Sequence, residues 1–240
     1  MRLGNFWINL CQGLLLALWH GADATFSLMS HFLSNIPGFM LTAFLLAMVP
    51  GQGVAMILRQ SILGGTRAAV FSVIGNSSGL VIWGTLSSLG LSAIFAASQS
   101  AYNILKWCGV AFLAFLSVQT LFQLRNESGR FEITGETFAS PGSAYRLGIF
   151  TNLTNVKAAV FAVAFLPAFV PKEFNLGLGI FILGWAWAFT SMSWYLMLIA
   201  MVDRSSVILS KPPVRRALTA ISALGILALA IGLALSKQHS

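Results

Sequence analysis

The chain alternates between long apolar segments and short polar connections. Six segments are long enough to cross a bilayer as helices, at roughly 20 residues per span, and apolar residues lie on all sides of each one, as in membrane helices. The pattern predicts an all-α, polytopic membrane protein with six transmembrane helices. The predicted spans are residues 36–58, 68–95, 101–122, 145–170, 175–201 and 216–235.

Polar residues interrupt two of these spans at corresponding places in the two halves of the chain. The first interruption is Pro50–Gly53 and the second is Asn152–Lys157. In hydrocarbon, a broken helix leaves backbone groups unpaired unless protein, water or a ligand satisfies them. Matched interruptions in two halves point to a transporter binding site. We therefore expect both interruptions to meet near the bilayer midplane and to line one cavity.

The first interruption combines three features that open a helix. Pro50 removes a backbone donor and clashes with the preceding turn, and Gly51 and Gly53 let the chain turn or let another backbone approach. Gln52 places an amide beside the freed backbone groups. A simple kink without a binding role is the alternative interpretation.

The second interruption carries a cation. Lys157 lies 12 residues after the start of its span at Tyr145, which is about 18 Å along a helix. A lysine at that depth costs about 2.5–3.5 kcal/mol on insertion scales, although its stem could instead reach toward an interface. Asn152 and Asn155 are three residues apart and share a helix face. These residues are candidates for substrate binding.

Lys157 has no obvious counter-ion, because no Asp or Glu lies well inside any predicted span. Three explanations stay open. Carbonyls at the broken helix end near Pro50 could stabilise the ammonium, the side chain could be a neutral amine, or the carboxylate of a substrate could pair with it.

The second span holds Asn76 among small residues, within Gly75–Gly79. This spacing predicts close helix packing, with Ser and Asn bridging between helices, and Asn76 is also a candidate to face the cavity. The full set of candidate substrate-binding residues is Pro50, Gly51, Gln52, Gly53, Asn76, Asn152, Asn155 and Lys157.

Composition supports the membrane assignment. Hydrophobic residues make up 57% of the 240 residues and charged residues only 8%, against about 25% charged in soluble domains. The net charge of +8 comes from basic residues at the ends of apolar segments, so we expect lipid rather than nucleic acid as the partner. Nine Lys and Arg lie in or beside the connections after the first, third and fifth spans, and three lie near the alternate connections or in the tail. This bias places the basic connections in the cytoplasm and the C-terminus outside it.

The domain organisation follows from the same pattern. Residues 1–34 form an N-terminal extension whose polar stripe predicts an interfacial amphipathic helix or a seventh span. Residues 35–240 form one transmembrane domain, with halves 36–122 and 145–235 joined by a cytoplasmic loop at 123–143. Each half has three spans, so the halves are expected to be inverted relative to one another.

The chain resembles the lysine-exporter (LysE/RhtB) family over about residues 36–235. The resemblance rests on Pro50-Gly51, on the turn Gly64-Gly65-Thr66-Arg67 that follows Arg59, on residues 105–113, and on the fourth-span residues Gly148, Asn152, Asn155, Lys157 and Ala158. The chain departs from the family pattern in three places. Gln52 replaces the second proline of Pro-Gly-Pro, Val156 replaces the proline of Asn-Pro-Lys, and Leu80 stands where many members have an acidic residue.

The resemblance implies export of amino acids or related small metabolites across the bacterial inner membrane, coupled to the proton gradient. It does not imply which substrate, and homo-oligomerisation stays open. The alternative from another class is a membrane enzyme or redox carrier. No intramembrane Ser/His/Asp set, paired carboxylates or CxxC motif supports one, so we expect no enzymatic activity. One alternative is metal or ion efflux, which needs clusters of His, Cys or acidic ligands; His20, His31 and His239 all lie outside the predicted spans. Another is a non-transporting membrane scaffold. Cys11 and Cys108 form no CxxC pair, and we expect no cofactor or metal.

Overall fold

The computed structural model describes residues 26–49, 51–125, 140–210 and 212–235, and every regular element in these ranges is a helix. The all-α prediction is therefore confirmed for this part of the chain. The elements are a first helix at Phe26–Met48, then α2 Gln52–Arg59, a π-helical segment Gln60–Gly64, α3 Gly65–Ala97, α4 Gln99–Arg125, α5 Pro141–Leu153, α6 Val156–Val160, a π-helical segment Phe161–Phe165, a 3-10 turn Leu166–Phe169, α7 Leu176–Ser210 and α8 Pro212–Leu235.

Three stretches of the described chain are long and apolar enough to cross a membrane: Phe26–Met48, Gln52–Leu91 and Leu176–Val202. A fourth candidate is the pair Pro141–Leu153 and Val156–Phe169, which is bent by 57° at a short break. Apolar stretches in α4 and α8 are shorter, at Lys106–Phe122 and Ala223–Gly232.

The first span differs from its prediction. Its helix already includes Phe26, ahead of the expected start at Ile36, and it ends at Met48, so Gln52–Arg59 is a separate short helix. The early turns were missed because Ser27, Ser30 and His31 lower the apparent hydropathy there. The hydroxyl of Ser30 donates a hydrogen bond to the carbonyl of Ser27 at 2.8 Å, so this polar side chain is satisfied within the helix. His31, expected outside the spans, therefore lies in this helix. Residues 1–25 of the predicted N-terminal extension lie outside the described residues.

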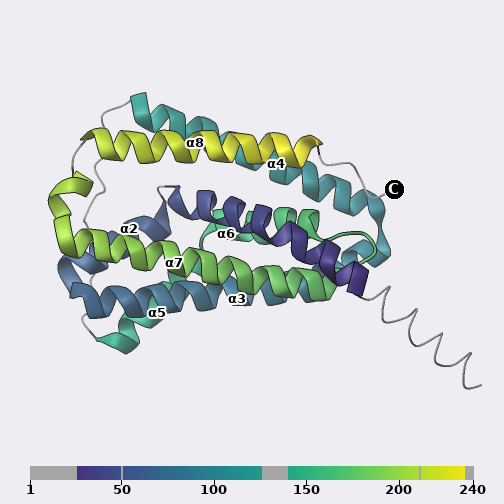
Figure 1. Cartoon of the computed structure of the whole chain (residues 1–240), viewed down its shortest axis with the longest axis horizontal. Helices are drawn as coiled ribbons and strands as arrows, with labels where there is room; N and C mark the ends of the chain where they lie inside the picture. Colours follow the sequence, from purple (N-terminus) through teal and green to yellow (C-terminus); the bar gives the residue numbers. More distant parts are fainter. Residues whose placement is uncertain (1–25, 50, 126–139, 211, 236–240) are drawn as a thin grey trace, which may run out of the picture.

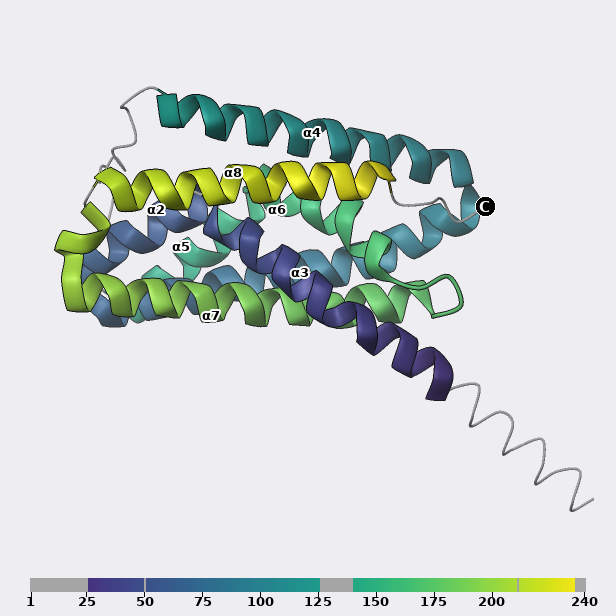
Figure 2. The same ribbon diagram turned by 45° about the horizontal axis from the view of Figure 1, so that its top comes forward.

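The long helices run side by side in a bundle (Figures 1 and 2). α3 packs against both α5 and α7, and α4 packs against α8. Glycines allow the α3–α5 approach, because a side chain at Gly75 would collide with the backbone carbonyl of Tyr145, and one at Gly148 would collide with the carbonyl of Ser72. The close packing predicted for the second span is confirmed.

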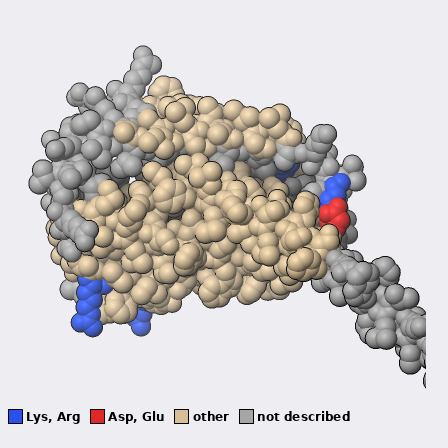
Figure 3. All heavy atoms as spheres, viewed as in Figure 1, with Lys and Arg blue, Asp and Glu red and all other residues tan. Residues whose placement is uncertain are grey.

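Large apolar side chains cover the flanks of the bundle, including Leu89, Phe150 and Phe189, each at least 60% exposed. Figure 3 shows one face on which the visible Lys, Arg, Asp and Glu atoms lie near the two ends. An apolar flank between charged ends fits a protein surrounded by lipid.

Aromatic rings fix the segment that follows the second interruption. The ring of Phe161 lies 4.8 Å from that of Trp187 on α7, 5.1 Å from Phe165 and 6.0 Å from Phe39 on the first helix, centroid to centroid. Phe161 is fully buried. These contacts hold α6 between the first helix and α7, and so position the residues at its start.

Candidate functional site

The first helix ends because Pro50 cannot donate a backbone hydrogen bond. The carbonyl of Leu46 would normally accept from the amide four residues later, which in this chain is proline. It accepts instead from the amide of Val49, at 3.3 Å. The chain then passes through Gly51 in an extended conformation, and α2 begins at Gln52. The placement of Pro50 itself lies outside the described residues.

The second break is made by polar side chains. This fits the presence of Val156 where the family pattern has a proline, because no missing backbone N–H contributes to the break. α5 ends at Leu153, and Asn155 is the N-cap of α6, where its Oδ1 accepts from the amide of Lys157 at 3.1 Å. The hydroxyl of Thr154 donates to the carbonyl of Phe150 at 2.8 Å. Capping side chains thus replace the backbone bonds that the bend removes.

Lys157 joins the two breaks. Its Nζ donates to the carbonyl oxygen of Leu46 at 3.1 Å and to that of Val49 at 3.4 Å, and it would lie 3.7 Å from a Cβ on Gly51. The C-terminal end of a helix carries partial negative charge, which stabilises a cation. Of the three explanations open for this lysine, the geometry supports the carbonyls of the first break.

Asn76 and Asn152 form a second polar contact between the halves. The Nδ2 of Asn152 lies 3.4 Å from the Oδ1 of Asn76, and both residues are buried. The backbone carbonyl of Asn152 accepts from the indole of Trp83 at 3.4 Å. The Oδ1 of Asn152 packs beside Gly79 and has no hydrogen-bond partner among the described residues.

Tyr195 is a further candidate site residue, which the sequence analysis did not include. A Cβ placed on Gly53 would lie 2.9 Å from its hydroxyl and 3.7 Å from the Nδ2 of Asn76. Tyr195 is buried in α7, and no hydrogen bond joins its hydroxyl to another residue in the part of the chain that the structure describes. The available signal was the polar group Thr190, Ser191 and Ser193 directly before Tyr195 in an otherwise apolar span, which the sequence analysis did not single out.

The predicted set is therefore largely brought together. Gly51 and Lys157 lie at one contact, Gly53 lies near Asn76 and Tyr195, Asn76 contacts Asn152, and Asn155 caps the helix that carries Lys157. Gln52 is the exception, because it is exposed and its amide makes no hydrogen bond within the described ranges.

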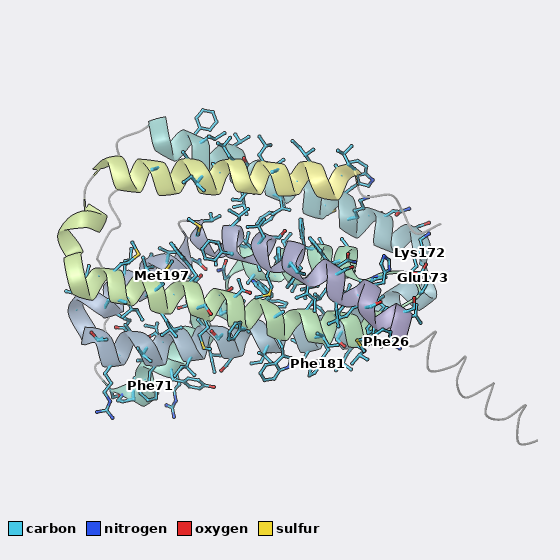
Figure 4. The ribbon with its side chains drawn as sticks, in the orientation of Figure 1. Phe26, Phe71, Lys172, Glu173, Phe181 and Met197 are labelled. Carbon is cyan, nitrogen blue, oxygen red and sulfur yellow. The ribbon has the colours of Figure 1, made fainter. Side chains whose placement is uncertain are left out.

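Lys172 and Glu173 lie together at one end of the bundle, far from the break before α6 (Figure 4). No group of three or more His, Cys, Asp or Glu that could hold a metal occurs among the described residues.

Comparison with known proteins places the chain in a family. Residues 44–237 match the family described as LysE type translocator. The homoserine/homoserine lactone efflux protein of Salmonella typhimurium is 38% identical over 136 residues, which are 56% of this chain and 64% of that protein. The leucine efflux protein of Salmonella typhi is 24% identical over 132 residues, 55% of this chain and 61% of that protein.

The uncharacterized membrane protein YrhP of Bacillus subtilis is 23% identical over 175 residues, 70% of this chain and 83% of that protein. The matches to the two efflux proteins span less than two thirds of their lengths. No solved structure matches the chain. The family match includes both breaks and most of the chain, and the long apolar helices fit a multi-pass membrane protein. The protein belongs to the LysE type translocator family.

Proposed function

We propose that this protein exports an amino acid, or a similar small carboxylate metabolite, across the bacterial inner membrane by secondary active transport. The observation that carries the proposal is the contact of Lys157 with the carbonyls of Leu46 and Val49, because it joins the broken helices of the two halves through one cation. Relatives named for efflux of homoserine and of leucine support an amino acid as substrate. Homoserine lactone, which the first of these names also includes, carries an amine but no free carboxylate.

The proposed architecture has six spans in two inverted halves of three. The pairwise packing supports it, since the second long helix α3 packs on the fifth, α7, and the third, α4, packs on the sixth, α8. The first and fourth spans meet at their breaks. Each helix thus pairs with its counterpart in the other half, as expected for inverted-repeat transporters.

The charges near the breaks favour a carboxylate on the substrate. Lys157 supplies a cation, and Asn76, Asn152 and Tyr195 supply uncharged polar groups. No Asp or Glu lies inside the spans to receive a second cation, and burying an unpaired charge is costly. We therefore propose a neutral or weakly polar amino acid as substrate, in preference to lysine or arginine.

The proposed orientation puts the basic connections in the cytoplasm. The ends of α3, α5, α7 and α8 that adjoin these connections lie at the same end of the bundle (Figure 1). The C-terminus then lies outside. The proposed driving force is the proton gradient, and Lys157 is the ionisable group best placed to respond to it, because its ammonium lies where the two halves meet.

Export from proteoliposomes tests this function. Vesicles that contain the purified protein are loaded with radiolabelled leucine, homoserine, lysine or arginine, and efflux is followed with and without an imposed pH gradient. We expect faster efflux of leucine or homoserine than from protein-free vesicles, further accelerated by the gradient, and little efflux of lysine and arginine. Efflux equal to that from protein-free vesicles for every compound would refute the function. Preferred export of lysine would refute the electrostatic argument.

A further inference from the structure

We propose that the carbonyl oxygens of Leu46 and Val49 are the binding subsite for the ammonium of the substrate, and that the ammonium of Lys157 fills this subsite until substrate takes its place. This inference rests on the proposed function and adds how the site recognises a zwitterion. Lys157 is then both a stand-in for the substrate's amino group and, once displaced, the partner of its carboxylate.

The chemistry of the subsite comes from Pro50. Because proline has no N–H, the carbonyl of Leu46 lacks its ordinary helical donor. Together with the carbonyl of Val49 it forms a pair of acceptors at the negative end of a helix. An alkylammonium already occupies the pair, at 3.1 and 3.4 Å. The Nζ of lysine and the amino group of an amino acid are both primary ammonium groups, so they make the same hydrogen bonds.

The other break does not offer such a subsite. The carbonyl of Phe150 accepts from the amide and the hydroxyl of Thr154 at 3.0 and 2.8 Å. The carbonyl of Asn152 accepts from the amide of Asn155 at 3.0 Å and from the indole of Trp83 at 3.4 Å. These donors belong to the backbone or to rigid side chains. At the first break the carbonyl of Leu46 also accepts from the amide of Val49, at 3.3 Å. Its other donor, which also donates to the carbonyl of Val49, is the long flexible side chain of Lys157, which can leave both oxygens.

Two ammonium groups cannot share the pair, because like charges in a low dielectric repel strongly. A zwitterion that places its ammonium on Leu46 and Val49 must therefore displace Lys157. Its own carboxylate lies within a few ångströms of its ammonium, so the displaced lysine finds a new partner nearby. A ligand with only a carboxylate would draw Lys157 away and leave the carbonyls of Leu46 and Val49 without a donor. A ligand with only an amine would occupy these carbonyls and leave Lys157 without an acceptor.

The exchange also links occupancy to the contact between the halves. Lys157 lies at the start of α6 and its acceptors lie at the end of the first helix. In the unoccupied site this side chain connects the two broken spans directly. In the occupied site the connection runs through the substrate. Binding therefore replaces a direct contact between the halves by one that leaves with the substrate.

Decarboxylated and deaminated analogues of leucine test the exchange. Thermal unfolding of the purified protein in detergent is measured with leucine, with isoamylamine, which lacks the carboxylate, and with 4-methylpentanoate, which lacks the amine. For the parental protein we expect leucine alone to raise Tm, by about 3 °C at a concentration roughly tenfold above Kd. Equal stabilisation by 4-methylpentanoate would overturn the exchange, because it would mean that Lys157 binds carboxylates without releasing its carbonyls.

Lys157→Ala reverses the expected selectivity. With the subsite vacated, isoamylamine should now raise Tm of the variant by about 3 °C, and 4-methylpentanoate should have no effect. Lys157→Met is the matched control, because its apolar stem fills the space without supplying an ammonium, and isoamylamine should not stabilise it. No stabilisation of Lys157→Ala by the amine would overturn the subsite.

If Lys157→Ala fails to fold, the test with leucine and its two analogues on the parental protein still tests the exchange. The two proposals can also fail separately. Amine binding to Lys157→Ala, together with no amino-acid binding or export by the parental protein, would support the subsite and refute the transport function. Export of leucine without any response of Lys157→Ala to the amine would support the function and refute the subsite.

Discussion

Gly84 of α3 and Gly184 of α7 meet backbone to backbone. A Cβ on either residue would lie 2.8 Å from the Cα of the other, 3.6 Å from its carbonyl carbon and 3.8 Å from its nitrogen. The distances are the same in both directions, so the crossing of these helices has local two-fold symmetry. This contact supports the proposed inverted repeat, in which α3 and α7 are equivalent helices.

Replacing either glycine should therefore have the same effect. We expect Gly84→Ala and Gly184→Ala each to lower the free energy of unfolding by about 1–3 kcal/mol, because a methyl group would overlap the facing backbone. Thermal unfolding in detergent measures the loss. Gly90→Ala is the control on the same helix, since a Cβ there meets nothing within 4 Å. Equal stability of the Gly84 and Gly90 variants would contradict the close crossing.

Lys157→Ala should abolish export while the protein still inserts in the membrane. The variant loses both hydrogen bonds to the first break and the cation for the substrate. Lys157→Arg should retain little activity, because a planar guanidinium is bulkier and has a different donor geometry. Export from loaded vesicles at matched protein content is the measurement. The control is Lys172→Ala, at an exposed position at the end of the bundle, which should export at the parental rate. Export by Lys157→Ala at the parental rate would contradict the assignment of Lys157 to the site.

Asn155→Ala should reduce both stability and export. Its side chain caps α6 by accepting from the amide of Lys157, and loss of such a cap costs about 1 kcal/mol. The matched control is Asn175→Ala, because Asn175 accepts in the same way from the amide of Leu178 at 2.9 Å, away from the breaks. Both variants should lose similar stability, and only Asn155→Ala should lose export. Equal export by the two would show that the cap has no role at the site.

Tyr195→Phe should lower export about three- to tenfold, the worth of one hydrogen bond to the substrate. It should leave Tm nearly unchanged, since the hydroxyl bonds to no residue in the described ranges. Tyr145→Phe should give the opposite pattern, a lower Tm with parental export, because the Tyr145 hydroxyl bonds to Ser78 at 3.2 Å and the residue lies in the first turns of α5. A Tyr195 variant with parental export would remove this residue from the site.

The orientation can be measured by labelling in intact cells with an impermeant maleimide. In a background with Cys11→Ser and Cys108→Ser, Ser128→Cys should stay unlabelled and Glu173→Cys should be labelled. The expectation rests on the excess of basic residues in the connections on one side. Labelling at 128 and protection at 173 would reverse the topology.

The sequence alone determined the class of the protein and the places where its helices break. Apolar segments with few charges require a membrane, and Pro50 and Asn155 each impose a local backbone effect that needs no knowledge of distant residues. The cap made by Asn155 follows from the same local chemistry. The start of the first helix was misplaced because polar residues in a membrane helix can bond to its own backbone, as Ser30 does.

Tertiary structure decided which groups satisfy one another across the two halves. The sequence left three partners open for Lys157, and only the packing of α6 against the first helix brings its Nζ to Leu46 and Val49. The position of Tyr195 beside Gly53 and the contact of Gly84 with Gly184 likewise join residues about 100 or more positions apart. Local sequence fixes where backbone groups become free, but the groups that meet them depend on how whole helices pack, which no single segment encodes.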